Sequence, residues 1–112
     1  MRSSIALAVG LALAAIVSAQ AADYAQQIVL KPAQIYEKNG RPRIVLSVNN
    51  NSPDVLDITV GCDFLDAGEK KIGSGHGSVS RLPPRRSDTV EVVDEVAQRA
   101  ETARCNVINA QK

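Results

Sequence analysis

The sequence predicts an all-β sandwich of about six antiparallel strands, and three observations lead to this prediction. Short apolar segments recur along the chain at a spacing of about 8–12 residues. In most of these segments apolar and polar residues alternate, which places one face of a strand in a core and the other in water. Clusters of Gly, Pro, Asn, Asp and Ser separate the segments and supply turns.

Two strands open the predicted domain. The first covers residues 27–30, is interrupted at Pro32 and resumes at residues 35–36. A proline at this place suits an edge strand, or a strand that shifts between two sheets. A turn at residues 38–40 leads to the second strand, residues 43–49, whose inward-facing residues are Ile44, Leu46 and Val48.

The two middle strands differ in how clearly apolar and polar residues alternate along them. After a turn cluster at residues 49–54, residues 57–65 alternate strongly, with an inward face of Ile58, Val60, Cys62 and Phe64. Residues 66–69 close a hairpin, and a weak strand follows whose apolar residues are thinned out by Gly73, Gly75 and Gly77. We expect this strand, Lys70–Leu82, to be a partly exposed edge of a sheet.

The C-terminal part combines strand and helix signals. Residues 83–87 contain two prolines and break the chain before a strand at residues 89–93. Residues 94–101 predict a short helical turn with Asp94 as its N-cap. The last strand covers residues 103–108.

The N-terminus has the layout of a secretory signal peptide. Arg2 provides a positive charge, residues 5–17 form an uncharged apolar run, and Ala19 and Ala21 are the small residues that signal peptidase reads. The run is shorter than the roughly 20 residues that span a bilayer, so we expect cleavage after Ala21 rather than an uncleaved membrane anchor. No Cys lies near this site to carry a lipid anchor. The predicted location is the periplasm of a bacterium, or the medium.

Removal of the signal peptide, residues 1–21, leaves one small β-sandwich domain, residues 22–112. Loss of Arg2 brings the 13 basic residues of the chain level with its 12 acidic ones, so the remaining domain is formally neutral. Its aromatic residues are Tyr24, Tyr36 and Phe64, and it has no Trp. Neutral charge and few aromatics argue against nucleic-acid binding and against an aromatic-lined pocket, so we expect no cofactor.

Cys62 and Cys105 lie in predicted strands of a chain that we expect in an oxidising compartment, which predicts a disulfide. This bond would stabilise the domain by about 4 kcal/mol in the chain-entropy model, a large share of the stability of a small domain. A redox-active or metal-binding pair is the alternative. Against it, the chain has no CxxC motif and no basic residue flanks Cys62.

A series of short motifs runs through residues 42–95. It consists of an apolar strand ending in Asn49-Asn50-Asn51-Ser52, then Leu56-Asp57-Ile58-Thr59-Val60, Phe64-Leu65-Asp66-Ala67, Ile72-Gly73-Ser74-Gly75, and Leu82-Pro83-Pro84 before a valine-rich strand. This series resembles bacterial FxLYD-type and related immunoglobulin-like domains. One departure is Gly68-Glu69, which stands where such domains usually have Asp-Gly. The resemblance implies an immunoglobulin-like sandwich in an exported or envelope setting and carries no catalytic residues.

Residues 73–78 have alternating glycines and superficially resemble a phosphate-binding loop. They lack the Lys-Ser/Thr pair of a P-loop, so we interpret them as an edge strand whose glycines permit a bulge or close packing. A triad of His76 with Ser74 or Ser78 and Asp63 would lack a nucleophile elbow. One His without free thiolates also makes a poor transition-metal site, and we expect it exposed on a polar strand.

Two further patterns are given structural interpretations. The acidic series Asp54, Asp57, Asp63, Asp66 and Glu69 lacks the spacing of a calcium loop, so we expect solvated side chains and no metal. The sequon Asn50-Asn51-Ser52 would matter only in a eukaryote, whereas the signal peptide and the family likeness indicate a bacterium.

Arg81, Arg85 and Arg86 surround Pro83-Pro84 and form the most pointed surface feature. On a proline-stiffened loop they could bind an acidic partner such as an envelope polysaccharide, lipid head groups or an acidic protein. The alternative is that they are simply solvated.

The sequence therefore predicts a small exported domain without catalytic activity, acting as an interaction or binding module of the cell envelope. One alternative is a structural or accessory subunit of an envelope or secreted complex; a hydrolase or metal-dependent enzyme has less support. The Lys70–Leu82 edge is a second expected binding element, because exposed edges accept strands from partners. The expected partner is an envelope protein or an acidic polysaccharide, and no membrane span is expected after cleavage.

Export predicts a defined N-terminus. N-terminal sequencing of protein recovered from the periplasm or the medium should begin at Ala22. A product that begins at Met1 would contradict cleavage and favour the uncleaved anchor.

Overall fold

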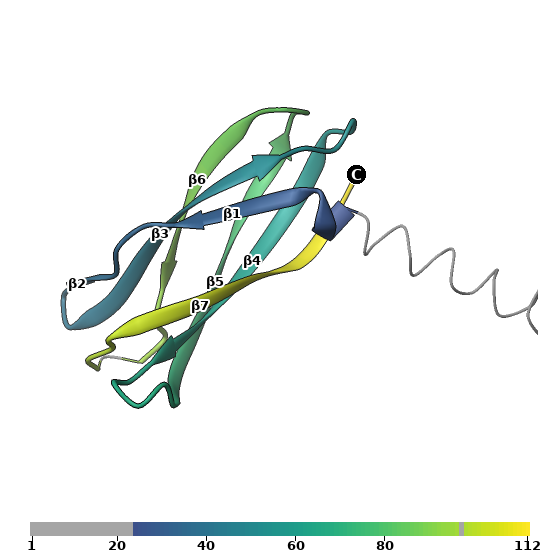
Figure 1. Cartoon of the computed structure of the whole chain (residues 1–112). Coiled ribbons are helices and arrows are strands. Elements are labelled where there is room, and N and C mark those ends of the chain that lie inside the picture. The colour runs from purple at the N-terminus through teal and green to yellow at the C-terminus, as the bar shows by residue number, and fades with distance from the viewer. Residues whose placement is uncertain (1–23, 97) are drawn as a thin grey trace, which may run out of the picture.

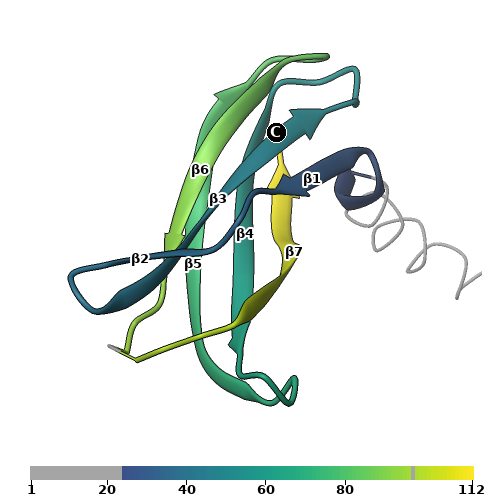
Figure 2. The same ribbon diagram turned by 60° about the vertical axis from the view of Figure 1, so that its left-hand side comes forward.

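The structure, a computed structural model, describes residues 24–96 and 98–112, and the predicted signal peptide at residues 1–21 lies outside them. After a helical turn at residues 24–26, the described chain forms seven strands in two antiparallel sheets packed face to face (Figures 1 and 2). The strands are β1 (Ile28–Pro32), β2 (Tyr36–Lys38), β3 (Arg41–Asn50), β4 (Leu56–Leu65), β5 (Lys71–Leu82), β6 (Ser87–Val93) and β7 (Thr102–Gln111). The prediction of an antiparallel all-β sandwich is confirmed.

The first sheet, sheet A, has β3 at its centre. β6 pairs with one edge of β3, whereas β1 and β2 pair end to end along the other edge. The N–H of Ala33 donates to the carbonyl of Val45 at 2.9 Å, so the chain stays beside β3 after Pro32 has ended β1. The predicted interrupted strand is therefore two strands, which is why the described chain has one strand more than expected.

The second sheet, sheet B, has β4 between β5 and β7. Cys62 of β4 lies directly opposite Cys105 of β7, with their Cα atoms 4.0 Å apart, and the predicted disulfide joins them. The bond links neighbouring strands of one sheet across a sequence separation of 43. Closing a loop of that length stabilises the fold by about 4 kcal/mol in the chain-entropy model.

The core lies between the two sheets and follows the predicted alternation. The inward-facing apolar side chains of the two central strands are at most 2% exposed. They are Ile44, Leu46 and Val48 of β3 and Leu56, Ile58, Val60, Cys62 and Phe64 of β4. Burying each large side chain of this kind stabilises the fold by about 1.5–3 kcal/mol, so these two strands supply most of the cohesion between the sheets.

Glycines on β5 let β6 lie unusually close to it. A Cβ atom on Gly75 would stand 2.2 Å from the carbonyl oxygen of Val93, and one on Gly77 would stand 2.6 Å from a methyl group of Val90. Both contacts are shorter than real Cβ atoms show. The interpretation of these glycines as close-packing positions is confirmed, and β5 forms one edge of sheet B as predicted.

A fully buried asparagine ties the two sheets together at one end of the sandwich. Asn50, the last residue of β3, donates from Nδ2 to the carbonyls of Asp54 at 2.8 Å and Leu82 at 2.9 Å. Its Oδ1 accepts from the N–H and the hydroxyl of Ser52 at 2.9 and 2.7 Å. Every hydrogen-bonding position of the amide is therefore used. Asn50 is also the acceptor of the sequon, and its buried side-chain nitrogen is inaccessible to glycosylation.

The two hairpin turns predicted at residues 38–40 and 66–69 are present. Asn39 and Gly40 have φ angles of 57° and 78°, as a two-residue type I′ turn requires. In the second turn Asp66 Oδ1 accepts the N–H groups of Gly68 and Lys70, both at 2.9 Å. Glu69 takes the left-handed conformation there, with a φ of 63°, at a cost of about 1–2 kcal/mol relative to a glycine.

The helical turn predicted for residues 94–101 is wrong: residues 94–96 and 98–101 form bends and coil. Asp94 is fully buried and still acts like a cap, because Oδ1 accepts the N–H of Val96 at 2.9 Å. Its Oδ2 accepts Gln98 Nε2 at 2.9 Å, and the same nitrogen donates to the carbonyl of Ile72 in β5. The missing side chain of Gly73 leaves the room for this arrangement.

The reason is that this segment crosses from sheet A to sheet B and gives its N–H groups to the sheets. Asp94 donates to the carbonyl of Pro42, Glu95 to that of Ser74, and Glu101 to that of Leu65. An isolated helical turn is costly to nucleate, so these tertiary hydrogen bonds outweigh the local helix signal.

Asn50→Ala should lower the free energy of unfolding by about 2–4 kcal/mol, because the buried carbonyls and the Ser52 hydroxyl lose their partners. Urea unfolding measures this loss. The exposed neighbour gives a matched control: Asn51→Ala should change stability by less than about 0.5 kcal/mol. Equal effects of the two substitutions would show that the amide of Asn50 does not hold the sheets together.

Gly75→Ala should destabilise the domain by about 1–3 kcal/mol, because its new methyl group meets the main chain of β6. Gly68→Ala is the control, since the nearest atom to its Cβ would be Asp66 Oδ1 at an ordinary 3.5 Å. That change should be neutral or stabilise by up to about 1 kcal/mol through the unfolded chain. Thermal unfolding of both variants would distinguish them, and a neutral Gly75→Ala would contradict the close packing of β6.

Candidate functional site

The predicted arginine cluster lies where β5 leads to β6, with Arg81 near the end of β5, Arg85 and Arg86 on the following loop, and all three side chains exposed. Arg81 and Arg85 adopt left-handed conformations, with φ angles of 54° and 60°. The N–H of Arg81 donates to Asp57 Oδ1 at 2.8 Å where a bulge ends β5. The main chains of Arg85 and Arg86 bind that of Asn50. The buried asparagine thus sets the shape of the loop, and none of the ion pairs within the described residues uses these arginines.

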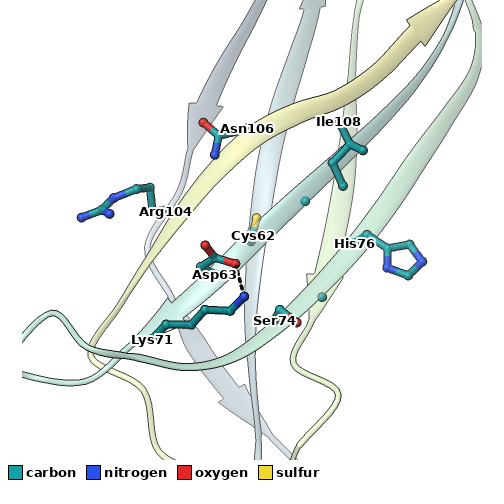
Figure 3. A pocket seen from close by; sticks show the side chains of 10 residues that line it. Cys62, Asp63, Lys71, Ser74, His76, Arg104, Asn106 and Ile108 are labelled. Carbon is teal, nitrogen blue, oxygen red and sulfur yellow. Dashed lines mark ion pairs between the residues drawn. The ribbon is translucent and has the colours of Figure 1, made fainter.

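His76 lies beside a shallow hollow on the outer face of sheet B (Figure 3). The hollow has a volume of about 320 Å³, and its lining includes Gly61 and Gly75. A bulge in β7 turns the exposed Ile108 over Gly61 from one side. Asp63 pairs with Lys71 at 3.3 Å across the opposite side.

The residues of the imagined triad, His76, Asp63 and Ser74 or Ser78, are not assembled as a triad in this hollow. Figure 3 shows the His76 ring directed away from Asp63, and no hydrogen bond within the described residues joins His76 to Ser74 or Ser78. Ser78 instead lies 3.4 Å from the hydroxyl of Thr59. The arrangement offers polar contacts to a small ligand and no assembled nucleophile–base pair.

The acidic residues are spread over the surface and are used locally. Asp54 accepts the Tyr24 hydroxyl at 2.8 Å, which raises the pKa of Tyr24, and it also lies 3.6 Å from Lys112 Nζ. Asp57 binds the Arg81 N–H. Within the described residues, no group of three or more His, Cys, Asp or Glu side chains converges on a point where a metal could sit.

The second predicted binding element, the β5 edge, is flanked by other parts of the domain. β6 packs against its glycines, and Glu95 donates a main-chain hydrogen bond to Ser74 at 3.1 Å. Figures 1 and 2 both show β5 and β6 side by side. The contacts with β6 lie on the inner face of β5, and a partner strand at this edge would have to displace the hydrogen bond from Glu95 to Ser74.

The opposite edge of sheet B is formed by β7, and no strand among residues 24–96 and 98–112 pairs with its outer side. The short Cα–Cα distance at Cys62 and Cys105 identifies a non-hydrogen-bonded pair. The main-chain groups of Cys105, and by alternation those of Ala103 and Val107, therefore point away from β4. Among the described residues β7 is the last strand of its sheet, and none of its edge groups hydrogen-bonds another strand.

A groove runs beside this free edge. It has a volume of about 260 Å³ and lies between the β1–β2 connection and the start of β7. Its lining is mainly apolar and includes Pro32, Ala33, Ile35, Ile44 and Ala103. Ile44 is only 2% exposed, so the groove reaches the core of the sandwich. A smaller hollow of about 190 Å³ continues past Ile35 toward Arg99 and Ala100.

The outer face of sheet A carries an ionic network that the sequence did not reveal. Glu91 of β6 accepts the Tyr36 hydroxyl at 2.5 Å and pairs with Arg43 at 2.6 Å. The hydrogen bond from Tyr36, followed by that from Arg43, holds the pKa of the Glu91 carboxyl below its ordinary value, and the pKa of Tyr36 is raised. Alternation places each of the three residues outward, but only the pairing of β3 with β2 and β6 brings them together.

No protein-family model, no curated protein and no solved structure matches the chain. Within the described residues, no helix has both the length and the apolar character of a membrane span.

Proposed function

We propose that this chain is an exported, non-catalytic interaction domain of the bacterial cell envelope that accepts an extended segment of a partner protein at the β7 edge. The observation that carries the proposal is the row of main-chain groups on Ala103, Cys105 and Val107, which no described residue pairs, beside a groove that reaches Ile44. The signal-peptide pattern and the disulfide support an oxidising compartment outside the cytoplasm.

Strand addition uses both parts of this surface. The unpaired N–H and C=O groups of an edge strand bind the main chain of an incoming segment, and alternate side chains of that segment supply specificity. Here, every second side chain of the segment would point toward the groove, which is lined by Ile35, Ile44 and Ala103. The partner is therefore an extended peptide segment with apolar residues at alternate positions.

The division of the strands between the two sheets resembles that of immunoglobulin domains. If β1 and β2 count as one interrupted strand, sheet A contains the first, second and fifth strands and sheet B the third, fourth and sixth. Immunoglobulin domains divide strands A, B, E and C, C′, F in the same way. This arrangement supports the resemblance to FxLYD-type domains, which stays a prediction.

The same edge also serves the alternative role of a structural or accessory subunit, if the partner strand is held permanently. A hydrolase or metal-dependent enzyme has less support, because the single His76 faces away from Asp63. The exposed Arg81, Arg85 and Arg86 are a second candidate contact, for an acidic polysaccharide or protein, since their loop has a defined shape without internal ion pairs.

Ala103→Pro should abolish strand addition, because proline removes an N–H from the free edge while edge strands tolerate it. Peptides selected from a displayed library of extended sequences supply the ligand, and NMR-detected amide exchange supplies the readout. In the free protein the amides of Ala103, Cys105 and Val107 should exchange faster than those of Arg104 and Asn106. A bound peptide should protect the three fast amides.

Ala103→Ser is the matched control, because it keeps the N–H and nearly the same volume, and it should bind the selected peptides as the unaltered protein does. Unchanged peptide affinity in Ala103→Pro, or peptides that protect no β7 amide, would overturn the proposal. Thermal unfolding of both variants verifies that each one is folded.

A further inference from the structure

The formal neutrality of the mature chain hides a strong separation of charge. Alternation along the four strands of sheet A places four basic residues on its outer face: Lys31, Lys38, Arg41 and Arg43. Glu91 is the acidic residue with outward parity in these strands, and it is already bound to Arg43 and Tyr36. The outer face of sheet A is therefore basic.

The positive charge is concentrated at the hairpin of β2 and β3, residues 36–43, which we call the basic hairpin. It carries three basic residues, Lys38, Arg41 and Arg43, and one acidic residue, the exposed Glu37. Lys38 and Arg41 are direct cross-strand partners on either side of the type I′ turn. Like charges at directly opposite positions destabilise a hairpin. No ion pair within the described residues involves Lys31, Lys38 or Arg41, and the Glu91 carboxylate attracts Lys38 only at longer range. An anionic surface outside the protein would offset the remaining repulsion between Lys38 and Arg41.

The shape of the basic hairpin indicates what kind of anion fits. Figure 2 shows the hairpin extending beyond the remainder of sheet A. Both basic residues beside the turn are exposed, on long side chains that reach past the main chain. A projecting tip of this kind meets a flat array of anions.

We propose that the basic hairpin docks the protein on an anionic phospholipid surface, with Lys38 and Arg41 contacting the phosphate groups and Lys31 adding attraction. The guanidinium of Arg41 can bind phosphate through two parallel hydrogen bonds, and Lys38 acts as a point charge. This surface lies on sheet A, is independent of the β7 edge, and leaves that edge free for a partner strand.

Vesicle sedimentation tests the proposal. The exported protein should bind vesicles of phosphatidylcholine with phosphatidylglycerol, bind pure phosphatidylcholine vesicles far more weakly, and lose binding at high salt. Each basic residue near an anionic surface contributes about a fivefold increase in affinity, so Lys38→Gln with Arg41→Gln should weaken binding about 25-fold. Lys31→Gln alone should weaken it up to about fivefold.

Arg85→Gln with Arg86→Gln is the matched control, because it removes the same net charge at the other end of β3, about 30 Å away. It should retain most of the binding, as should Ala103→Pro, which separates this result from the proposal for β7. An equal loss in both double variants, unchanged binding without Lys38 and Arg41, or binding to dextran sulfate without binding to vesicles would overturn the proposal. Circular dichroism verifies that each variant is folded.

Discussion

The two sheets share one core, and at one end of the sandwich a buried amide joins the strand ends of one sheet to those of the other. Asn50 ends β3 in sheet A and binds the carbonyl of Leu82 at the end of β5 in sheet B. Its main chain binds Arg85 and Arg86, so the shape of an exposed loop is set from the core. An apolar residue of similar size would leave these buried groups unpaired, at about 1–3 kcal/mol each.

The two long sides of the sandwich differ in how their edge strands are covered. On one side, Gly75 and Gly77 let β6 lie directly on β5, and Glu95 occupies the carbonyl of Ser74. On the other side, no described residue pairs the edge groups of β7, which lie beside a groove that reaches Ile44. This is the side on which we propose that a partner strand joins the sandwich. The basic hairpin belongs to the other sheet, and its proposed contact with lipid depends on charge.

Local patterns predicted most of the fold because each depends on neighbours along the chain. Alternation identified the buried faces of β3 and β4, and Pro32 marked the break between β1 and β2, since a missing N–H acts wherever the strand lies. The helix signal at residues 94–101 failed because tertiary hydrogen bonds from the sheets outweighed a weak local preference. The weak strand β5 was identified as an edge, but its closeness to β6 follows only from the packing of the two sheets.

By itself the sequence determined the fold class, the inward faces of the strands, the pairing of two cysteines that had no other partner, and the exposure of Arg81, Arg85 and Arg86. These properties follow from short-range periodicity and composition. Only the tertiary structure decided that β7 is an outer strand of sheet B among the described residues, that Asn50 links the sheets, and that Tyr36, Arg43 and Glu91 meet on one face. Each of these depends on which strands become neighbours across long stretches of chain, and that is set by the packing of the core as a whole.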